Sequence, residues 1–156
     1  LIDTIRDRIP EICIRTSLIA GFPGETREDV EAVKAFLAKT RLDRVGIFTY
    51  SHEENTHAFS LKDDVSAKEK KRRADFIMEV QSEISLQKNQ EKVGREMKVL
   101  IDRAEGPYFI GRTEYDSPEV DNEVIIHAPD QYLRIGDFVK VKVVNAENYD
   151  LVGSLI

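Results

Sequence analysis

The chain has 156 residues, of which 41% are hydrophobic and 33% charged, and it carries a net charge of −6. This composition is ordinary for a globular protein with one sizeable core or two small ones. No apolar run approaches the roughly 20 residues that cross a bilayer and no signal peptide opens the chain, so we expect a cytoplasmic protein that does not contact a membrane.

The first predicted elements are a strand, a turn with two glycines, and a helix. Residues Ile12–Ala20 are apolar at both ends with a polar centre, and we interpret them as a strand. The turn is Gly21–Thr26. Thr26 and Asp29 have the spacing of a capping box, so a helix should begin at Thr26 and continue with one apolar face to about Lys39.

A second strand, Arg44–Tyr50, follows after a short connection. The order strand, helix, strand predicts two parallel strands joined by a right-handed crossover. Gly21 and Gly24 then stand at the carboxyl end of the first strand, where parallel α/β folds bind ligands. Two interpretations remain open: the glycines only shape the turn, or they let the backbone approach a ligand. A phosphate-binding loop is excluded because it needs a third glycine and a Lys-Ser/Thr pair.

Residues 51–65 are polar without a sustained period, so we predict a loop. It contains His52 and His57, but no cysteine or third histidine lies near them in sequence. We therefore predict no metal site.

A long helix is predicted next. Ser66 and Glu69 form a second capping box, and neither glycine nor proline interrupts the chain before Gly94, which gives a helix of roughly 25 residues. Its start carries the basic run Lys68–Arg73. We predict that this run is a solvated face, with a nucleic-acid-binding patch as the alternative.

The remaining residues predict a small all-β domain. Alternation in 139–143, where valines are separated by lysines, indicates a strand with one buried face. Five short antiparallel strands would form an OB-like barrel. The predicted strands are Met97–Asp102, Tyr108–Arg112, Glu123–His127, Phe138–Asn145 and Asp150–Ile156.

Two strings of the sequence resemble a known family. Residues Arg15–Thr26 and Arg41–Ser51 are similar to segments of the radical S-adenosylmethionine methylthiotransferases, and most similar to the branch that modifies an aspartate of a ribosomal protein. The resemblance implies an α/β plus all-β fold: residues 1–65 as the C-terminal part of a partial (β/α) radical S-adenosylmethionine barrel, 66–92 as a linker helix, and 93–156 as a TRAM β-barrel.

The resemblance also implies where the cofactor binds. Two strand ends would face S-adenosylmethionine, and the implied cofactor-binding residues are Arg15, Thr16, Ser17, Gly21, Gly24, Glu25, Phe48 and Tyr50. No catalytic base or nucleophile is implied, because the radical step belongs to the cofactor and its metal clusters.

The family holds two [4Fe-4S] clusters with two sets of three cysteines, whereas this chain contains one cysteine, Cys13. Its position in an apolar strand predicts a buried residue without catalytic function. The chain also starts in the middle of a predicted helix. We therefore expect a C-terminal fragment that binds no cluster or other cofactor by itself and is inactive alone.

The charge of the predicted barrel bears on its partner. Residues 93–156 contain seven Lys or Arg against twelve Asp or Glu, a net charge of −5. RNA-binding barrels present basic grooves, so we do not expect RNA binding. Five of the acids lie in Glu114–Glu123. With the resemblance, this loop is interpreted as the docking site for a basic small-subunit ribosomal protein. The proposed docking residues are Arg112, Asp116, Glu119 and Asp121.

Three functions remain open from the sequence. The first is an aspartate methylthiotransferase of ribosomal protein, and the second is a transfer-RNA methylthiotransferase of the same family. The third is a non-catalytic adaptor whose acidic barrel docks a basic protein. A CxxxCxxC motif elsewhere in the full gene product would decide for an enzyme.

Overall fold

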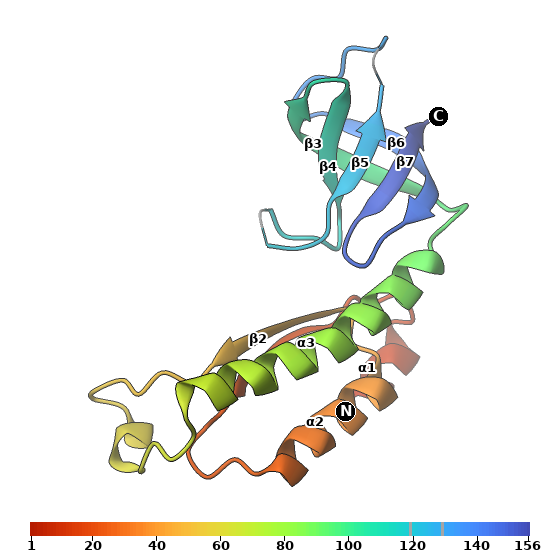
Figure 1. Ribbon diagram of the computed structural model, residues 1–156. Helices are drawn as coiled ribbons and strands as arrows, with labels where there is room; N and C mark the ends of the chain where they lie inside the picture. Colours follow the sequence, from red (N-terminus) through yellow and green to blue (C-terminus); the bar gives the residue numbers. More distant parts are fainter. Residues whose placement is uncertain (119, 129) are drawn as a thin grey trace. The chain divides into compact units, whose positions relative to one another are not determined.

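A computed structural model describes residues 1–118, 120–128 and 130–156. By its internal contacts the chain divides into two compact units, Leu1–Ile84 and Ser85–Ile156. The first is an α/β unit and the second contains a closed β-barrel (Figure 1). Within the described residues, no helix is both long enough and apolar enough to span a membrane.

The first unit contains a two-stranded sheet with helices packed on one of its faces. In chain order its elements are α1 (Ile2–Arg8), β1 (Arg15–Ala20), α2 (Arg27–Thr40), β2 (Arg44–Thr49), the short 3-10 helix η1 (His57–Ser60) and most of α3 (Ala67–Gln90). Strands β1 and β2 pair in parallel, from Arg15 opposite Arg44 to Ala20 opposite Thr49, which confirms the predicted parallel pairing.

Strand β1 begins three residues later than the sequence predicts. Asp43 is the cause, because its carboxylate Oδ2 accepts the Ile14 N–H at 2.9 Å. The Ile14 carbonyl in turn accepts the N–H groups of Asp43 and Arg44, at 3.0 and 3.3 Å. The backbone groups of Ile14 are therefore hydrogen-bonded to the connection before β2, and regular strand pairing starts only at Arg15.

Helix α2 begins at the predicted cap. Thr26 Oγ1 accepts the Asp29 N–H at 3.2 Å, and Asp29 Oδ2 accepts the Thr26 N–H at 2.8 Å, which completes the capping box. The hydrogen bonds from the Thr26 backbone and side chain lower the pKa of Asp29 below its usual value. Arg41, in the left-handed region at φ 45°, ends the helix and donates its N–H to the Leu37 carbonyl at 2.8 Å.

Helices α2 and α3 cover one face of the two-stranded sheet (Figure 1). Side chains alternate along each strand, so every second residue points toward the helices. Ala20 and Val45 are buried in a core with Leu37 of α2 and Ile77 of α3. This burial of apolar surface holds the unit together.

Helix α3 confirms the predicted long helix, at 24 residues. Ser66 Oγ accepts the Glu69 N–H at 3.3 Å at its start. Its last turn belongs to the second unit, where the fully buried Asn89 side chain donates to the Glu147 carbonyl at 3.0 Å.

The second unit is the expected five-stranded barrel. Its strands are β3 (Glu96–Glu105), β4 (Tyr108–Thr113), β5 (Val124–His127), β6 (Phe138–Ala146) and β7 (Leu151–Leu155), closed in the order β3-β4-β5-β7-β6. The prediction that all strands are antiparallel is wrong at one pair, because β5 and β7 run parallel, with Val124 opposite Leu151. The connection after β5 crosses the barrel so that β6 pairs with β3, and β7 then returns beside β5.

The alternation predicted for β6 is confirmed. Val141 and Val143 are buried in the barrel core, whereas Lys140 and Lys142 are exposed. Gly153 on β7 lies directly against this core, where an added Cβ would stand 2.0 Å from Val141 Cγ1. Glycine at position 153 therefore lets β7 pack closely against Val141 of β6.

Candidate functional site

The turn between β1 and α2 depends on both of its glycines. Gly21 and Gly24 have φ angles of 78° and 81°, in the left-handed region that side chains disfavour. The Gly21 N–H donates to Glu25 Oε2 at 2.9 Å, and the Gly24 N–H donates to Asp64 Oδ1 at 2.9 Å. Because both amides have internal acceptors, these two N–H groups are not free to bind a ligand. A ligand can still approach the backbone at Gly24, where nothing lies within 4 Å of the position of a Cβ.

Glu25 is held from the other side by Arg73 of α3. Arg73 NH1 donates to Glu25 Oε2 and to the Glu25 carbonyl, both at 2.7 Å. These hydrogen bonds are the main reason that the pKa of Arg73 lies above its usual value. The Glu25 side chain, expected at the cofactor, is therefore engaged within the turn. That Glu25 binds the cofactor stays a prediction, and the contact would have to come from its backbone.

Lys70 lies one helical turn before Arg73 and is buried at the end of β2. Its ammonium donates to Asp63 Oδ2 at 2.7 Å and to the Tyr50 carbonyl at 3.3 Å, and it stands 4.8 Å from the centroid of the Tyr50 ring. The prediction that Lys68–Arg73 is simply a solvated face is wrong for Lys70 and Arg73, whose side chains are 8% and 11% exposed. No local pattern in the sequence marks Asp63 as the acceptor of Lys70 or Glu25 as the acceptor of Arg73.

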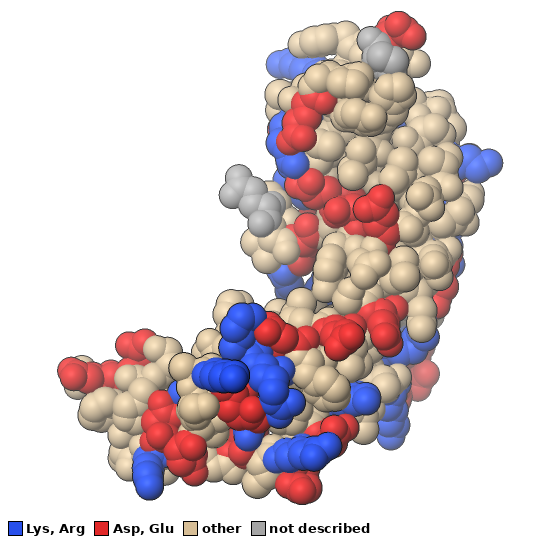
Figure 2. Space-filling model, viewed as in Figure 1, with Lys and Arg blue, Asp and Glu red and all other residues tan. Residues whose placement is uncertain are grey.

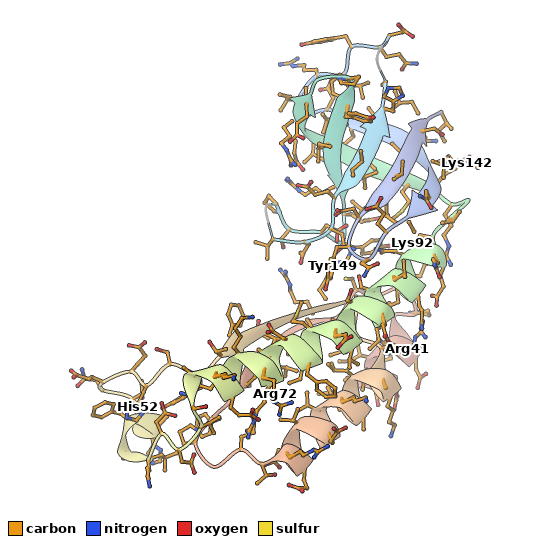
Figure 3. All side chains as sticks on the ribbon, viewed as in Figure 1. Arg41, His52, Arg72, Lys92, Lys142 and Tyr149 are labelled. Atoms are coloured by element: carbon orange, nitrogen blue, oxygen red, sulfur yellow. The ribbon has the colours of Figure 1, made fainter. Side chains whose placement is uncertain are left out.

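The other cations of the run do face solvent. Lys71 pairs with Asp75 at 2.6 Å, and Arg72, on the side of α3 that faces α2 in Figure 3, pairs with Glu69 at 2.7 Å. Hydrogen bonds from Arg72, and then from Arg73, lower the pKa of Glu69 to about 2. Exposed pairs of this kind contribute little to stability.

Tyr50 connects the ends of the two strands. Its N–H donates to the Ala20 carbonyl at 2.9 Å, and its ring meets that of Phe22 edge to face, with centroids 5.2 Å apart. The hydroxyl lies 3.1 Å from His52 Nδ1, in the loop after β2. The Tyr50 ring is buried, so the contact that Tyr50 could offer a cofactor is again limited largely to its backbone.

The face of the sheet turned away from the helices is open. Ile19 and Phe48, opposite each other in register, are 58% and 61% exposed, an unusual position for large apolar side chains in a strand pair. Beside them Ser17 pairs with Gly46, and an added Cβ at Gly46 would stand 3.3 Å from the Phe48 ring and 3.7 Å from Ser17 Oγ. Two large apolar and two small residues thus form a surface that suits a flat ligand.

The structure does not bring all predicted cofactor residues together. Phe48 and the glycine turn lie toward the carboxyl half of the sheet, whereas Arg15 stands at the other end of β1, about 17 Å from Ala20 at about 3.3 Å per residue, with Ser17 two residues along the same face. Thr16 alternates to the face that the helices cover. Ile19 and Gly46 were missed, although the alternation from Ser17 identifies Ile19.

The open face and the glycine turn fit the apolar and backbone-approach requirements of an adenosine cofactor. They do not fit a metal cluster. The chain has a single cysteine, and among the described residues no group of three or more His, Cys, Asp or Glu side chains is placed to hold a metal ion.

The acidic segment of the barrel unit is folded by its own carboxylates. Asp116, 9% exposed, accepts the Thr113 hydroxyl at 2.6 Å, and Asp121 accepts the Ser117 N–H at 2.7 Å. Arg112 is hydrogen-bonded to Asp102. Glu119, the fourth proposed docking residue, lies outside the described residues. Of the three that are described, each has a structural contact that a partner would have to share.

A second part of the acidic surplus is neutralised within the barrel. Arg103 forms two hydrogen bonds with Glu123, at 2.6 and 2.9 Å, and one with Glu105 at 2.6 Å. The bonds to Glu123 and Glu105 raise the pKa of Arg103, and Arg103 lowers the pKa of Glu123.

The lysines of the barrel gather on its β3–β6 side. Lys98 and Lys140 are opposite each other in register, and Lys142, labelled in Figure 3, follows on β6. The Lys98 ammonium lies 4.1 Å from the centroid of Phe138, which is largely exposed. A net charge of −5 therefore conceals a local basic face. The expectation that the barrel does not bind RNA rested on net charge and stays a prediction.

Residues 93–156 match the family model described as the TRAM domain. The whole chain is 53% identical to the ribosomal protein uS12 methylthiotransferase RimO of Cytophaga hutchinsonii, over 36% of that protein. It is 54% identical over 98% of its length to RimO of Christiangramia forsetii, and 45% identical over its full length to RimO of Bacteroides thetaiotaomicron. The chain is a homologue of part of RimO.

The similarity to RimO covers both units and confirms the family resemblance noted in the two motif strings. The barrel is the TRAM domain. The chain spans about a third of the length of the RimO relatives that it matches. The match to RimO includes the segment with Lys70 and Arg73, the two cations that contact the glycine turn.

Proposed function

We propose that the full-length gene product is a radical S-adenosylmethionine methylthiotransferase that adds a methylthio group to the β-carbon of an aspartate in ribosomal protein uS12. The observation that carries this proposal is identity of 53% and 54% with two RimO proteins over 100% and 98% of the chain. The relatives named above all carry the name ribosomal protein uS12 methylthiotransferase, which favours the uS12 branch over a transfer-RNA methylthiotransferase.

Within this proposal, residues 1–65 belong to the radical S-adenosylmethionine domain, 66–92 to a linker helix, and 93–156 to the TRAM domain. The exposed face of β1 and β2 supports the first assignment, because the helix-free face of a (β/α) barrel strand points into the barrel. We place the reaction in the cytoplasm, where a ribosomal protein is available.

S-adenosylmethionine and two [4Fe-4S] clusters, when bound, supply the radical chemistry, and we propose that cysteines outside this chain hold the clusters. The residues of this chain bind and orient. Phe48 and Ile19 would contact the flat part of S-adenosylmethionine, Gly24 would let the backbone approach it, and Ser17 would offer a hydroxyl on the same face. Gly21 would contribute by letting the turn pack on Lys70. An apolar face with few polar groups is typical of cofactor sites.

The decisive experiment uses the full-length gene product reconstituted with iron and sulfide and supplied with S-adenosylmethionine and a one-electron reductant. Mass spectrometry of uS12 should show the gain of one methylthio group on an aspartate, and transfer RNA in the same mixture should remain unmodified. Modification of transfer RNA alone would establish the second candidate. If an intact, cluster-loaded protein modifies neither substrate, the third function, a non-catalytic adaptor, is the one that remains.

A matched pair of variants tests the open face. Phe48→Ala should weaken S-adenosylmethionine binding about tenfold, since it removes most of the apolar surface under the ligand. Phe36→Ala, at an exposed position on α2, should leave binding unchanged. Equal affinities for the two variants would contradict the proposed cofactor surface.

A further inference from the structure

We propose that Lys70 and Arg73 are positioning residues that hold the two strand-end loops in the shape that receives the cofactor. The inference rests on the proposed function for the identity of the ligand. The contacts themselves belong to this chain. Arg73 donates hydrogen bonds to Glu25 in the turn after β1, and Lys70 donates one to the Tyr50 carbonyl at the end of β2.

The two side chains act from one face of α3. Residues three apart on a helix are neighbours, so Lys70 and Arg73 point the same way, toward the carboxyl ends of β1 and β2. Lys71 and Arg72, between them, point elsewhere and pair on the surface of the helix. A single helical turn thus contacts both loops at the edge where parallel α/β folds bind ligands.

Burial makes these contacts specific. A buried charge is tolerated only where it is paired, so each cation fixes the position of its partner. Arg73 binds the carboxylate and the carbonyl of Glu25 together, and Lys70 binds Asp63 and Tyr50 together. Loss of Arg73 would leave the Glu25 carboxylate, whose side chain is only 13% exposed, without its cation.

The packing at Gly21 excludes a looser arrangement. A Cβ at Gly21 would stand 2.3 Å from Lys70 Cγ, so the turn backbone lies directly on the lysine stem. The Gly21 N–H donates to the same Glu25 oxygen, Oε2, that accepts Arg73. Helix, glycine and carboxylate therefore specify one turn geometry.

Such preorganisation should increase cofactor affinity. A turn that is already ordered loses less conformational freedom when the ligand binds. Arg73 and Lys70 hold Glu25 and Asp63, while Ile19 and Phe48 on the open face stay 58% and 61% exposed. Loss of either cation should raise KM for S-adenosylmethionine with little change in kcat, because it affects binding and not the chemical step.

The test uses Arg73→Gln and Lys70→Gln in the full-length gene product, with Lys71→Gln as the matched control. Hydrogen exchange followed by mass spectrometry should show faster exchange in residues 21–26 for the first and 49–51 for the second. The dissociation constant of S-adenosylmethionine should rise about tenfold in both and stay unchanged in Lys71→Gln. Arg73→Lys, which keeps the charge, should recover part of the affinity and covers the case that Arg73→Gln does not fold.

A double-mutant cycle separates positioning from direct contact. If Arg73 acts through Glu25, then Arg73→Gln should cost no further affinity in a Glu25→Gln background. Additive losses would overturn the proposal, as would faster exchange of the turn without any loss of affinity. If the unmodified protein does not bind S-adenosylmethionine, the proposed function fails, while the exchange data still decide whether the cations hold the loops.

Discussion

At the scale of single residues, position on the helix decides what each cation of the basic run does. Lys71 and Arg72 pair with acids on the helix surface, and Lys70 and Arg73, in the same six-residue run, are buried in the adjoining turns. The glycines of the motif divide in the same way. Gly21 lies against Lys70, whereas nothing lies within 4 Å of where a Cβ of Gly24 would stand.

This difference predicts unequal costs for Gly21→Ala and Gly24→Ala. Both substitutions place a side chain in the left-handed region, at a cost of about 1–2 kcal/mol. Gly21→Ala adds a steric overlap with Lys70, which costs about 1–3 kcal/mol more. Urea unfolding at equilibrium measures both. Equal midpoints for the two variants would show that the Lys70 contact does not constrain the turn.

At the scale of elements, the helix caps and the alternation of buried residues were predictable from the sequence, whereas the pairing of distant strands and side chains was not. Thr26 and Ser66 mark the starts of two helices through contacts three residues away, and the valines of β6 mark its buried face. The parallel pairing of β5 with β7 depends on how the barrel closes. The burial of Lys70 depends on Asp63, in the preceding loop, and on Tyr50, twenty residues away. Neither distant contact leaves a local pattern in the sequence.

Barrel closure gives a prediction at this scale. Gly153→Ala should destabilise the barrel by about 1–3 kcal/mol, because the new methyl group overlaps Val141 Cγ1. Adding Val141→Ala removes the overlapping group and should make the double variant more stable than the sum of the two single changes. Thermal unfolding followed by circular dichroism tests this. A strictly additive pair would mean that β7 moves away from β6 to accept the methyl group.

At the scale of the whole molecule, the distribution of charge is more informative than its sum. Figure 2 shows acidic and basic side chains interspersed over the visible surface. In the barrel unit, Arg103 neutralises part of the acidic surplus and the lysines of β3 and β6 gather on one face. Net charge could be read from the sequence, but this separation requires the strand register.

The proposed docking of a basic ribosomal protein depends on this distribution. Asp116→Asn and Asp121→Asn remove charge and also disturb the segment that these carboxylates fold, whereas Glu114→Gln removes an exposed charge only. We expect Glu114→Gln to weaken uS12 binding two- to fivefold at low salt and by less at high salt. Binding measured at two ionic strengths, with Glu31→Gln on α2 as the control, decides this. If only the Asp116→Asn and Asp121→Asn variants lose affinity for uS12, the conformation of the loop, and not its charge, is what the partner recognises.

The hydrogen bond between the Gly24 N–H and Asp64 joins residues forty positions apart in the chain. Together with the neighbouring Asp63–Lys70 pair, it anchors the far end of the loop that follows β2. Within this loop, η1 is held by Tyr50, whose hydroxyl donates to the Ala58 carbonyl at 3.3 Å, while Glu54 and Asn55 lie exposed before it. The entropy of a longer loop rises only slowly with its length, so insertions at Glu54 and Asn55 should be tolerated, provided that Asp63 keeps its contact with Lys70 and Asp64 its contact with Gly24.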